Sequence, residues 1–139
     1  MDLGDISLVL QVAILFLLIL GLPLVRRTGN KKNLMRHGYL TVLALILHTI
    51  LISIVMIPSF SSGFGEMGEL SFLDGLNVWF HAILGTAAEI LGFIVVAFWF
   101  SKPLSNMACL KVKKIMLPLL IIWTMSLING ALIHILGIL

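Results

Sequence analysis

The chain has 139 residues, of which 60% are hydrophobic and only 11% are charged. Soluble domains carry about 45–50% apolar and about 25% charged residues, and a domain of about 150 residues buries only about 70% of its surface. A soluble monomer this short cannot bury so much apolar surface. A single cysteine and the lack of a glycine repeat exclude a disulfide scaffold and collagen. The composition therefore predicts a membrane protein.

The net charge of +3 comes from nine Lys and Arg residues that are confined to residues 26–36 and 102–114. Five of the six acidic residues lie in other segments, at positions 2, 5, 66, 69 and 74. Basic and acidic segments that alternate between apolar runs are typical of the positive-inside rule. This distribution argues for a lipid bilayer as the partner and against nucleic acid.

Four apolar runs are long enough to cross a bilayer, whose hydrocarbon core of about 30 Å needs about 20 helical residues. They are residues 6–25, 38–58, 77–100 and 115–138. Short connections between them favour an all-α integral membrane fold, an up-down-up-down bundle of four transmembrane helices. With no internal repeat, we expect a single membrane domain over residues 1–139. Pro58 is expected to end the second helix, and Pro118 to lie in the first turn of the fourth.

The charges also predict the orientation, in the plasma membrane of a prokaryote. The basic loops, residues 26–37 and 101–114, are expected to face the cytoplasm, which places both termini outside. Trp79 and Trp99 are 20 residues apart, or about 30 Å in a helix, so each ring is expected at an interface. Cys109 lies in the second basic loop and is the only cysteine, so it cannot form an internal disulfide.

Ionisable side chains inside apolar runs are costly in a membrane and are candidates for function. His81 lies four residues into the third run, and His134 lies about four residues from the end of the fourth. The two are therefore expected at the same depth on antiparallel helices. His37 follows Arg36 at the start of the second run and is expected at the level of the lipid headgroups.

Glycines near two of these histidines suggest a haem site. Gly85 follows His81 by four residues and Gly130 precedes His134 by four, so each glycine lies one turn deeper on the same helix face. We predict that His81 and His134 ligate the iron of one haem b, with the bare glycines leaving room for the porphyrin. Asn77 is expected to accept the other ring N–H of His81. The alternative interpretation of the glycines is close helix packing.

His48 and Glu89 lie near the centres of the second and third runs. At similar depth they can share a proton or a hydrogen bond. They are candidates for a proton relay or a quinone-type site beside the haem, and the alternative is a buried polar pair that fixes the helix register. His48 is also the substitute iron ligand, in case the faces that carry His81 and His134 do not meet.

Several short motifs resemble the small four-span membrane proteins of domain-of-unknown-function family 420. The resemblance covers nearly the whole chain and lies in residues 36–40, 55–58, 80–85, 113–114, 123 and 130. His48 and His134 stand where members of that family usually have other residues. Some relatives are associated with the maturation of haem-copper oxidases, so the resemblance implies a respiratory context. More loosely, the chain is similar to small b-type cytochromes.

Two functions are therefore expected. The first is a membrane b-type haem-binding protein or subunit that transfers electrons in a respiratory chain, with a quinone-type carrier and other membrane subunits as partners. The second is an assembly or accessory subunit of a haem-copper oxidase-type complex, without catalysis of its own. The sequence carries no G-x-S-x-G, H-E-x-x-H or phosphate-binding loop, so a stand-alone enzyme is less expected than an electron carrier or accessory subunit.

Overall fold

The computed structural model describes residues 3–26, 31–63, 71–101 and 106–138, although the side chains of residues 3, 25–26, 31, 63 and 106–113, Cys109 among them, lie outside that description. The described residues are almost entirely helical. The elements are α1 (Leu3–Arg26), α2 (Lys31–Leu51), the π-helical segment η1 (Ile52–Met56), α3 (Ile57–Gly63), α4 (Phe72–Ser101) and α5 (Asn106–Ile135).

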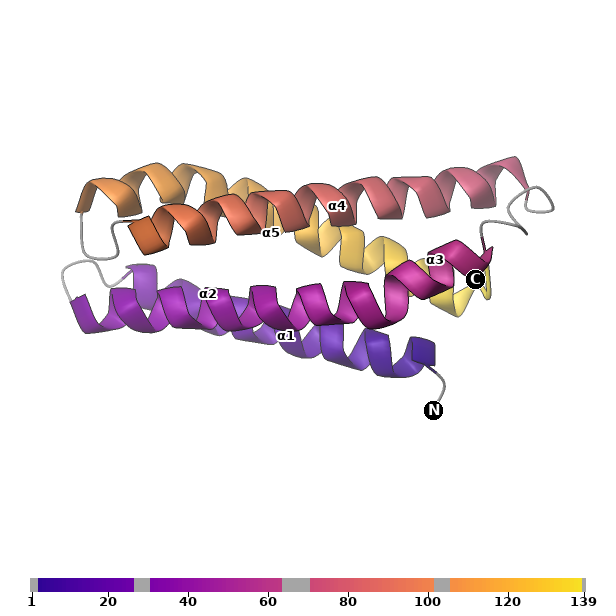
Figure 1. Cartoon of the computed structure of the whole chain (residues 1–139), viewed down its shortest axis with the longest axis horizontal. Coiled ribbons are helices and arrows are strands. Elements are labelled where there is room, and N and C mark those ends of the chain that lie inside the picture. The colour runs from indigo at the N-terminus through magenta and orange to yellow at the C-terminus, as the bar shows by residue number, and fades with distance from the viewer. Residues whose placement is uncertain (1–2, 27–30, 64–70, 102–105, 139) are drawn as a thin grey trace.

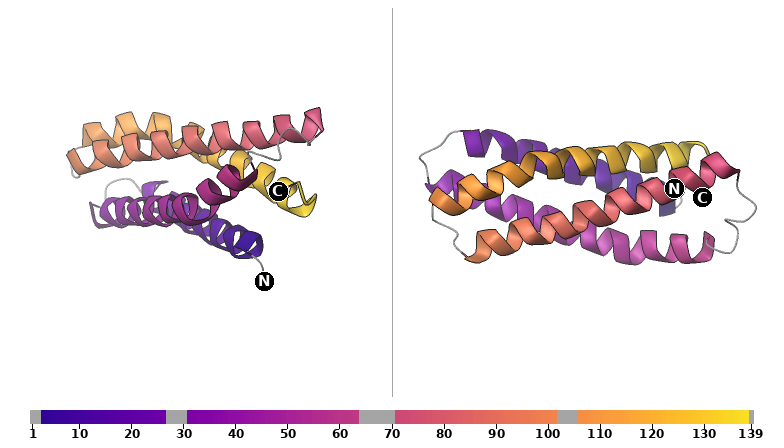
Figure 2. Two further views of the ribbon diagram at one scale, coloured as in Figure 1. Left: turned by 45° about the vertical axis from the view of Figure 1, so that its right-hand side comes forward. Right: turned by 90° about the horizontal axis from the view of Figure 1, so that it is seen from above.

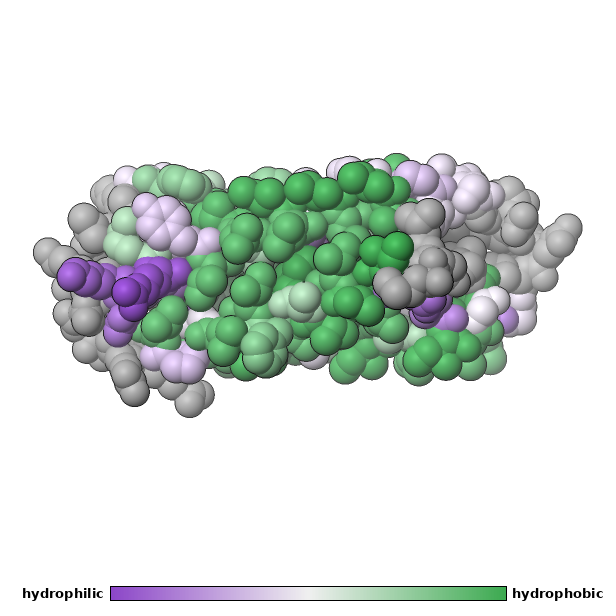
Figure 3. Space-filling model, turned by 90° about the horizontal axis from the view of Figure 1, so that it is seen from below, coloured by the Kyte–Doolittle hydropathy of each residue, from purple (hydrophilic) through white to green (hydrophobic). Residues whose placement is uncertain are grey.

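Among the described residues, four helices are long and apolar enough to cross a membrane, which confirms the prediction of an all-helical fold with four candidate spans. The spans are Gly4–Leu24, Lys32–Ser62, Phe72–Ser101 and Lys114–Ile135. Hydrophobic side chains cover the middle of the molecule in Figure 3, and hydrophilic side chains gather toward its two ends. This banding is what a bilayer requires of a protein that crosses it.

The helices lie side by side in two pairs. α1 packs along α2, and α4 packs along α5, while smaller contacts between α2 and α4 and between α1 and α5 join the pairs (Figures 1 and 2). The N- and C-termini lie at one end of the molecule (Figure 1), which we call the terminal end. The opposite end, where α1 ends and α2 begins, is called the basic end because Lys32, Arg36 and Lys114 are exposed near it.

Pro58 does not end the second helix, contrary to the expectation from the sequence. The helix continues from α2 through η1 into α3 and ends at Gly63. Proline lacks an N–H and its ring crowds the preceding turn. The chain meets this constraint with a wider π turn just before Pro58, in which the N–H of Ile57 bonds the carbonyl of Ile52.

Pro118 also lies inside a helix rather than in its first turn. α5 begins at Asn106, nine residues before the start at residue 115 that the apolar run predicted. Hydropathy detects only the part of a helix that lipid can cover, and residues 106–114 include three lysines, at positions 111, 113 and 114, that interrupt the apolar run. The candidate span itself starts at Lys114, one residue from the predicted start, so the apolar run located the span and missed the start of the helix by more than two turns.

The centre of the bundle is an apolar core with one residue from each long helix. Ile14, Ala44, Ala88 and Trp123 are 2–6% exposed and form one cluster. A side chain at Gly92 would place its Cβ 2.8 Å from Cδ1 of Leu45, so this glycine lets α4 approach α2 closely. The core fixes the helices around a polar site that lies beside it.

Candidate functional site

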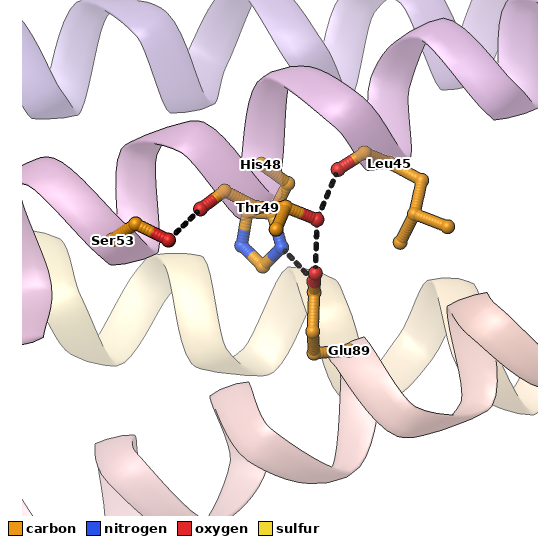
Figure 4. A network of polar contacts seen from close by, with 5 residues as sticks. All are labelled: Leu45, His48, Thr49, Ser53 and Glu89. Atoms are coloured by element: carbon orange, nitrogen blue, oxygen red, sulfur yellow. Dashed lines mark hydrogen bonds and ion pairs between the residues drawn. The ribbon is translucent and has the colours of Figure 1, made fainter.

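The polar site at the centre of the bundle joins α2 to α4. Nδ1 of His48 lies 2.7 Å from Oε2 of Glu89, and the Thr49 hydroxyl donates to Oε1 of Glu89 at 2.5 Å. Figure 4 shows these side chains pointing toward one another from the two helices. The sequence placed His48 and Glu89 at similar depth, and the structure brings them together. Thr49 was missed, although its position next to His48 makes it a natural partner.

The environment of the pair determines which nitrogen of His48 is left for a ligand. A carboxylate oxygen accepts, so Nδ1 of His48 donates to Glu89 and Nε2 is the nitrogen left for another partner. The ring is 6% exposed and meets the indole of Trp123 edge-on, with the ring centroids 5.4 Å apart. Histidines that bind metals or relay protons are held in this way, by an oxygen on the opposite nitrogen.

An apolar cavity of about 300 Å³ extends from this pair toward the basic end. Its walls come from all four long helices and are mostly hydrophobic. Measured along α2, His48 and His37 mark its two ends and lie 11 residues apart, or about 16 Å at about 1.5 Å per residue. The cavity is lined by Ile14, Leu18, Leu22, His37, Thr41, Ala44, Leu45, His48, Ala88, Glu89, Gly92, Met116, Leu117, Leu119, Leu120 and Trp123.

His37 belongs to the wall of the cavity, and its level relative to the lipid headgroups stays a prediction. It is 8% exposed, and its Nδ1 lies 2.9 Å from the carbonyl oxygen of Gly21. Its Nε2 is buried and has no hydrogen-bond partner among the described residues. α2 turns the adjacent Arg36 to the surface and His37 inward. The sequence feature that could have indicated this inward position is Gly21 on the preceding helix, whose missing side chain leaves room for the His37 ring.

His81 packs against α5. Its Nδ1 lies 2.9 Å from the carbonyl oxygen of Ser126, so the acceptor is Ser126 rather than the predicted Asn77. A Cβ on Gly130 would lie 2.6 Å from Cε1 of His81, and one on Gly85 would lie 3.4 Å from Oγ of Ser126. Both glycine patches are thus covered by side chains of the facing helix, which is the arrangement expected for close helix packing.

His134 faces a different helix from His81. Its Nε2 lies 3.1 Å from Oδ1 of Asp5 on α1. Shared ligation of one iron would require His134 to leave Asp5 and His81 to withdraw from Gly130, so this arrangement does not fit the predicted haem site. Within the described ranges, no group of three or more His, Cys, Asp or Glu side chains could hold a metal ion.

The strongest candidate site is therefore the His48–Glu89 pair with its cavity. Binding pockets are usually apolar and carry a few convergent polar groups, as this one does. No family model, curated protein sequence or solved structure matches the chain.

Proposed function

We propose that the chain is a multi-pass protein of the plasma membrane whose helices cross in alternate directions, with the basic loops in the cytoplasm and both termini outside. The support is the confinement of Lys and Arg to two stretches, together with two termini at one end of the molecule (Figure 1). Lys and Arg are enriched in cytoplasmic loops.

The orientation can be tested with an impermeant thiol reagent on intact cells. Cysteine introduced at Ser62, an exposed residue of α3 near the terminal end, is expected to be labelled. The native Cys109, in the second basic segment and at the start of α5, is expected to stay unlabelled until the cells are opened. Labelling of Cys109 alone in intact cells would show that the protein has the opposite orientation.

We further propose that the cavity binds a lipid-soluble molecule of the quinone class, with a ring oxygen at Nε2 of His48. The observation that carries this proposal is the bonding of Glu89 to His48 and Thr49 in the wall of an apolar cavity. A lipid chain without polar groups forms no hydrogen bond with a histidine–carboxylate pair and exchanges no proton with it. A quinone gains or loses protons at its oxygens whenever it is reduced or oxidised, and such a pair can supply or accept them.

His48 can serve both forms of such a ligand. When Nε2 carries no proton, it accepts a hydrogen bond and then the proton of a ring hydroxyl. When Nε2 is protonated, it donates to a ring carbonyl. Glu89 holds the imidazole in place through Nδ1 and stabilises its charged form, the role of the carboxylate in catalytic triads, and Thr49 positions Glu89. Electrons pass to or from a partner subunit, which places the chain in a respiratory complex as an electron-transfer or accessory subunit.

Binding can be measured through the fluorescence of Trp123, which lines the cavity and is 6% exposed. A short-chain naphthoquinone added to the purified protein in lipid nanodiscs is expected to quench this fluorescence saturably, because the ring binds against the indole. Ala88→Leu is expected to abolish the saturable phase, because Ala88 is 2% exposed and the added atoms occupy the cavity.

Ala97→Leu is the matched control, since Ala97 lies on the same helix with an exposed side chain. It is expected to leave quenching unchanged. Trp123→Phe identifies the reporter, because it should remove the saturable phase while Trp79 and Trp99 remain. Equal saturable quenching in the wild-type chain and Ala88→Leu would show that the quinone binds elsewhere.

A further inference from the structure

Buried polar side chains are concentrated on one side of the His48–Glu89 pair. Between this pair and the terminal end, two residues of α1 and two of α5 are only 6–8% exposed. Polar side chains in a membrane core cost free energy and are seldom placed there for packing alone. On the basic side of the pair the interior is the mostly hydrophobic cavity. The four residues are Ser7, Gln11, Ser126 and Asn129.

Two contacts place α1 and α5 in register through this region. Near the terminal end Asp5 meets His134 at 3.1 Å, and at the centre Ile14 and Trp123 share the apolar core. The four buried polar residues lie between these two contacts. Their spacing is four residues on α1 and three on α5, so each pair occupies one face of its helix. Because they are buried in a bundle where α1 meets α5, both faces point inward.

The side-chain oxygen of Asn129 is unsatisfied within the part of the chain that the structure describes. This atom, Oδ1, is buried and accepts no hydrogen bond from the described residues. On α1, the side-chain amide of Gln11 donates to the Ser7 hydroxyl at 3.3 Å, its one partner among the described residues. A buried acceptor left unpaired costs about 1–3 kcal/mol. Buried water characteristically satisfies such groups, with about three hydrogen bonds per molecule.

An exposed pair of side chains lies at the terminal end of this region. His134 and Asp5 are 28% and 47% exposed, so the ion pair lies at the surface. Deeper in the bundle, the imidazole of His81 on α4 contacts the backbone carbonyl of Ser126 on α5. His81 precedes Glu89 by eight residues, or about 12 Å along α4. Histidine side chains can shuttle protons between hydrogen-bonded partners, and histidines lie at the outer end, the middle and the inner end of the region.

We propose that the terminal half of the bundle is a hydrated half-channel that connects the solution at the terminal end with the His48–Glu89 pair. Water at Asn129 and the imidazole of His81 carry protons along it, while the apolar cavity on the other side receives the ligand. The physiological role of the channel rests on the proposed function, because a proton path matters only if the ligand site releases or takes up protons. The channel would then exchange these protons with the solution at the terminal end. Its existence does not require that a quinone binds.

Reaction of engineered cysteines with a small charged methanethiosulfonate tests the channel, because this reagent modifies thiols that water reaches. The background is Cys109→Ser in nanodiscs. Ser126→Cys and Ser7→Cys, both buried and both nearly isosteric changes, are expected to lose their free thiol. Ala44→Cys is the matched control, because Ala44 is 3% exposed and lines the apolar cavity. It is expected to keep its thiol.

Thermal unfolding of each variant verifies the fold, and Ser7→Cys decides the outcome if Ser126→Cys does not fold. The proposal is overturned if the folded Ser7 and Ser126 variants keep their thiols. It is also overturned if Ala44→Cys reacts as fast as they do, since the interior would then be hydrated on both sides. No quinone is added, so either result leaves the quenching experiment as an independent test of ligand binding.

Discussion

Replacing Gly38 by alanine is expected to destabilise the folded bundle by about 1–3 kcal/mol, the typical cost of overpacking a filled core. Gly38 is buried on α2, where a Cβ would overlap the indole of Trp99 on α4. That indole cannot move freely, because Tyr39 and Phe100 pack against it at centroid distances of 5.5 and 5.1 Å. Thermal unfolding in detergent, followed by circular dichroism, measures the effect.

Gly75→Ala is the matched control, since Gly75 is also helical but no atom lies within 4 Å of the Cβ it would gain. This change is expected to stabilise α4 slightly, by about 0.5–1 kcal/mol, because alanine loses less conformational freedom in a helix. Equal unfolding temperatures for the Gly38 and Gly75 variants would contradict the close contact between α2 and α4 at Trp99.

Glu89→Ala is expected to weaken quinone binding about 10–100-fold. The change removes the acceptor of His48 Nδ1 and Thr49, and a hydrogen bond to a charged group contributes about 1.5–3 kcal/mol. Without Glu89 the imidazole turns freely and Nε2 no longer meets the ring oxygen. Titration of the Trp123 fluorescence with the short-chain naphthoquinone measures the affinity.

Glu89→Gln separates the positioning role from the proton-linked role. Its amide oxygen still accepts from His48, so binding should stay close to that of the wild-type chain while quinol turnover in the complete complex slows. Thr86→Ala, at an exposed position on the same helix, should change neither quantity. If Glu89→Gln instead fails to fold, the pair acts as a structural contact. If Glu89→Ala binds as tightly as the wild-type chain, Glu89 does not hold the ligand site.

The four candidate spans were predictable because a membrane imposes a length and a composition on every helix that crosses it. The end of the second helix was not, because a π turn before Pro58 depends on local backbone geometry that hydropathy does not record. The start of α5 was missed for a related reason, since three lysines among residues 106–114 interrupt the apolar run. Apolar runs identify spans well and helix ends poorly.

Depth along a helix was predictable, but rotation about its axis was not. His48 and Glu89 were matched by depth, and their faces meet. His81 and His134 were also matched by depth, yet one bonds Ser126 and the other Asp5. Helix rotation follows from packing across the whole bundle, including where small residues such as Gly130 admit a neighbouring ring. This information lies in no single helix, so the spacing of four residues could not reveal it.

Photolabelling with an azido-substituted quinone tests the central claim most directly. The quinone is activated by light in the purified protein in nanodiscs, and the modified peptides are mapped by mass spectrometry. Modification is expected on the cavity-lining residues 41–48 of α2 and 116–123 of α5. It should be lost in Ala88→Leu and competed by unlabelled quinone. Modification that spreads over the exposed lipid-facing residues and is unchanged in Ala88→Leu would contradict a quinone site in the cavity.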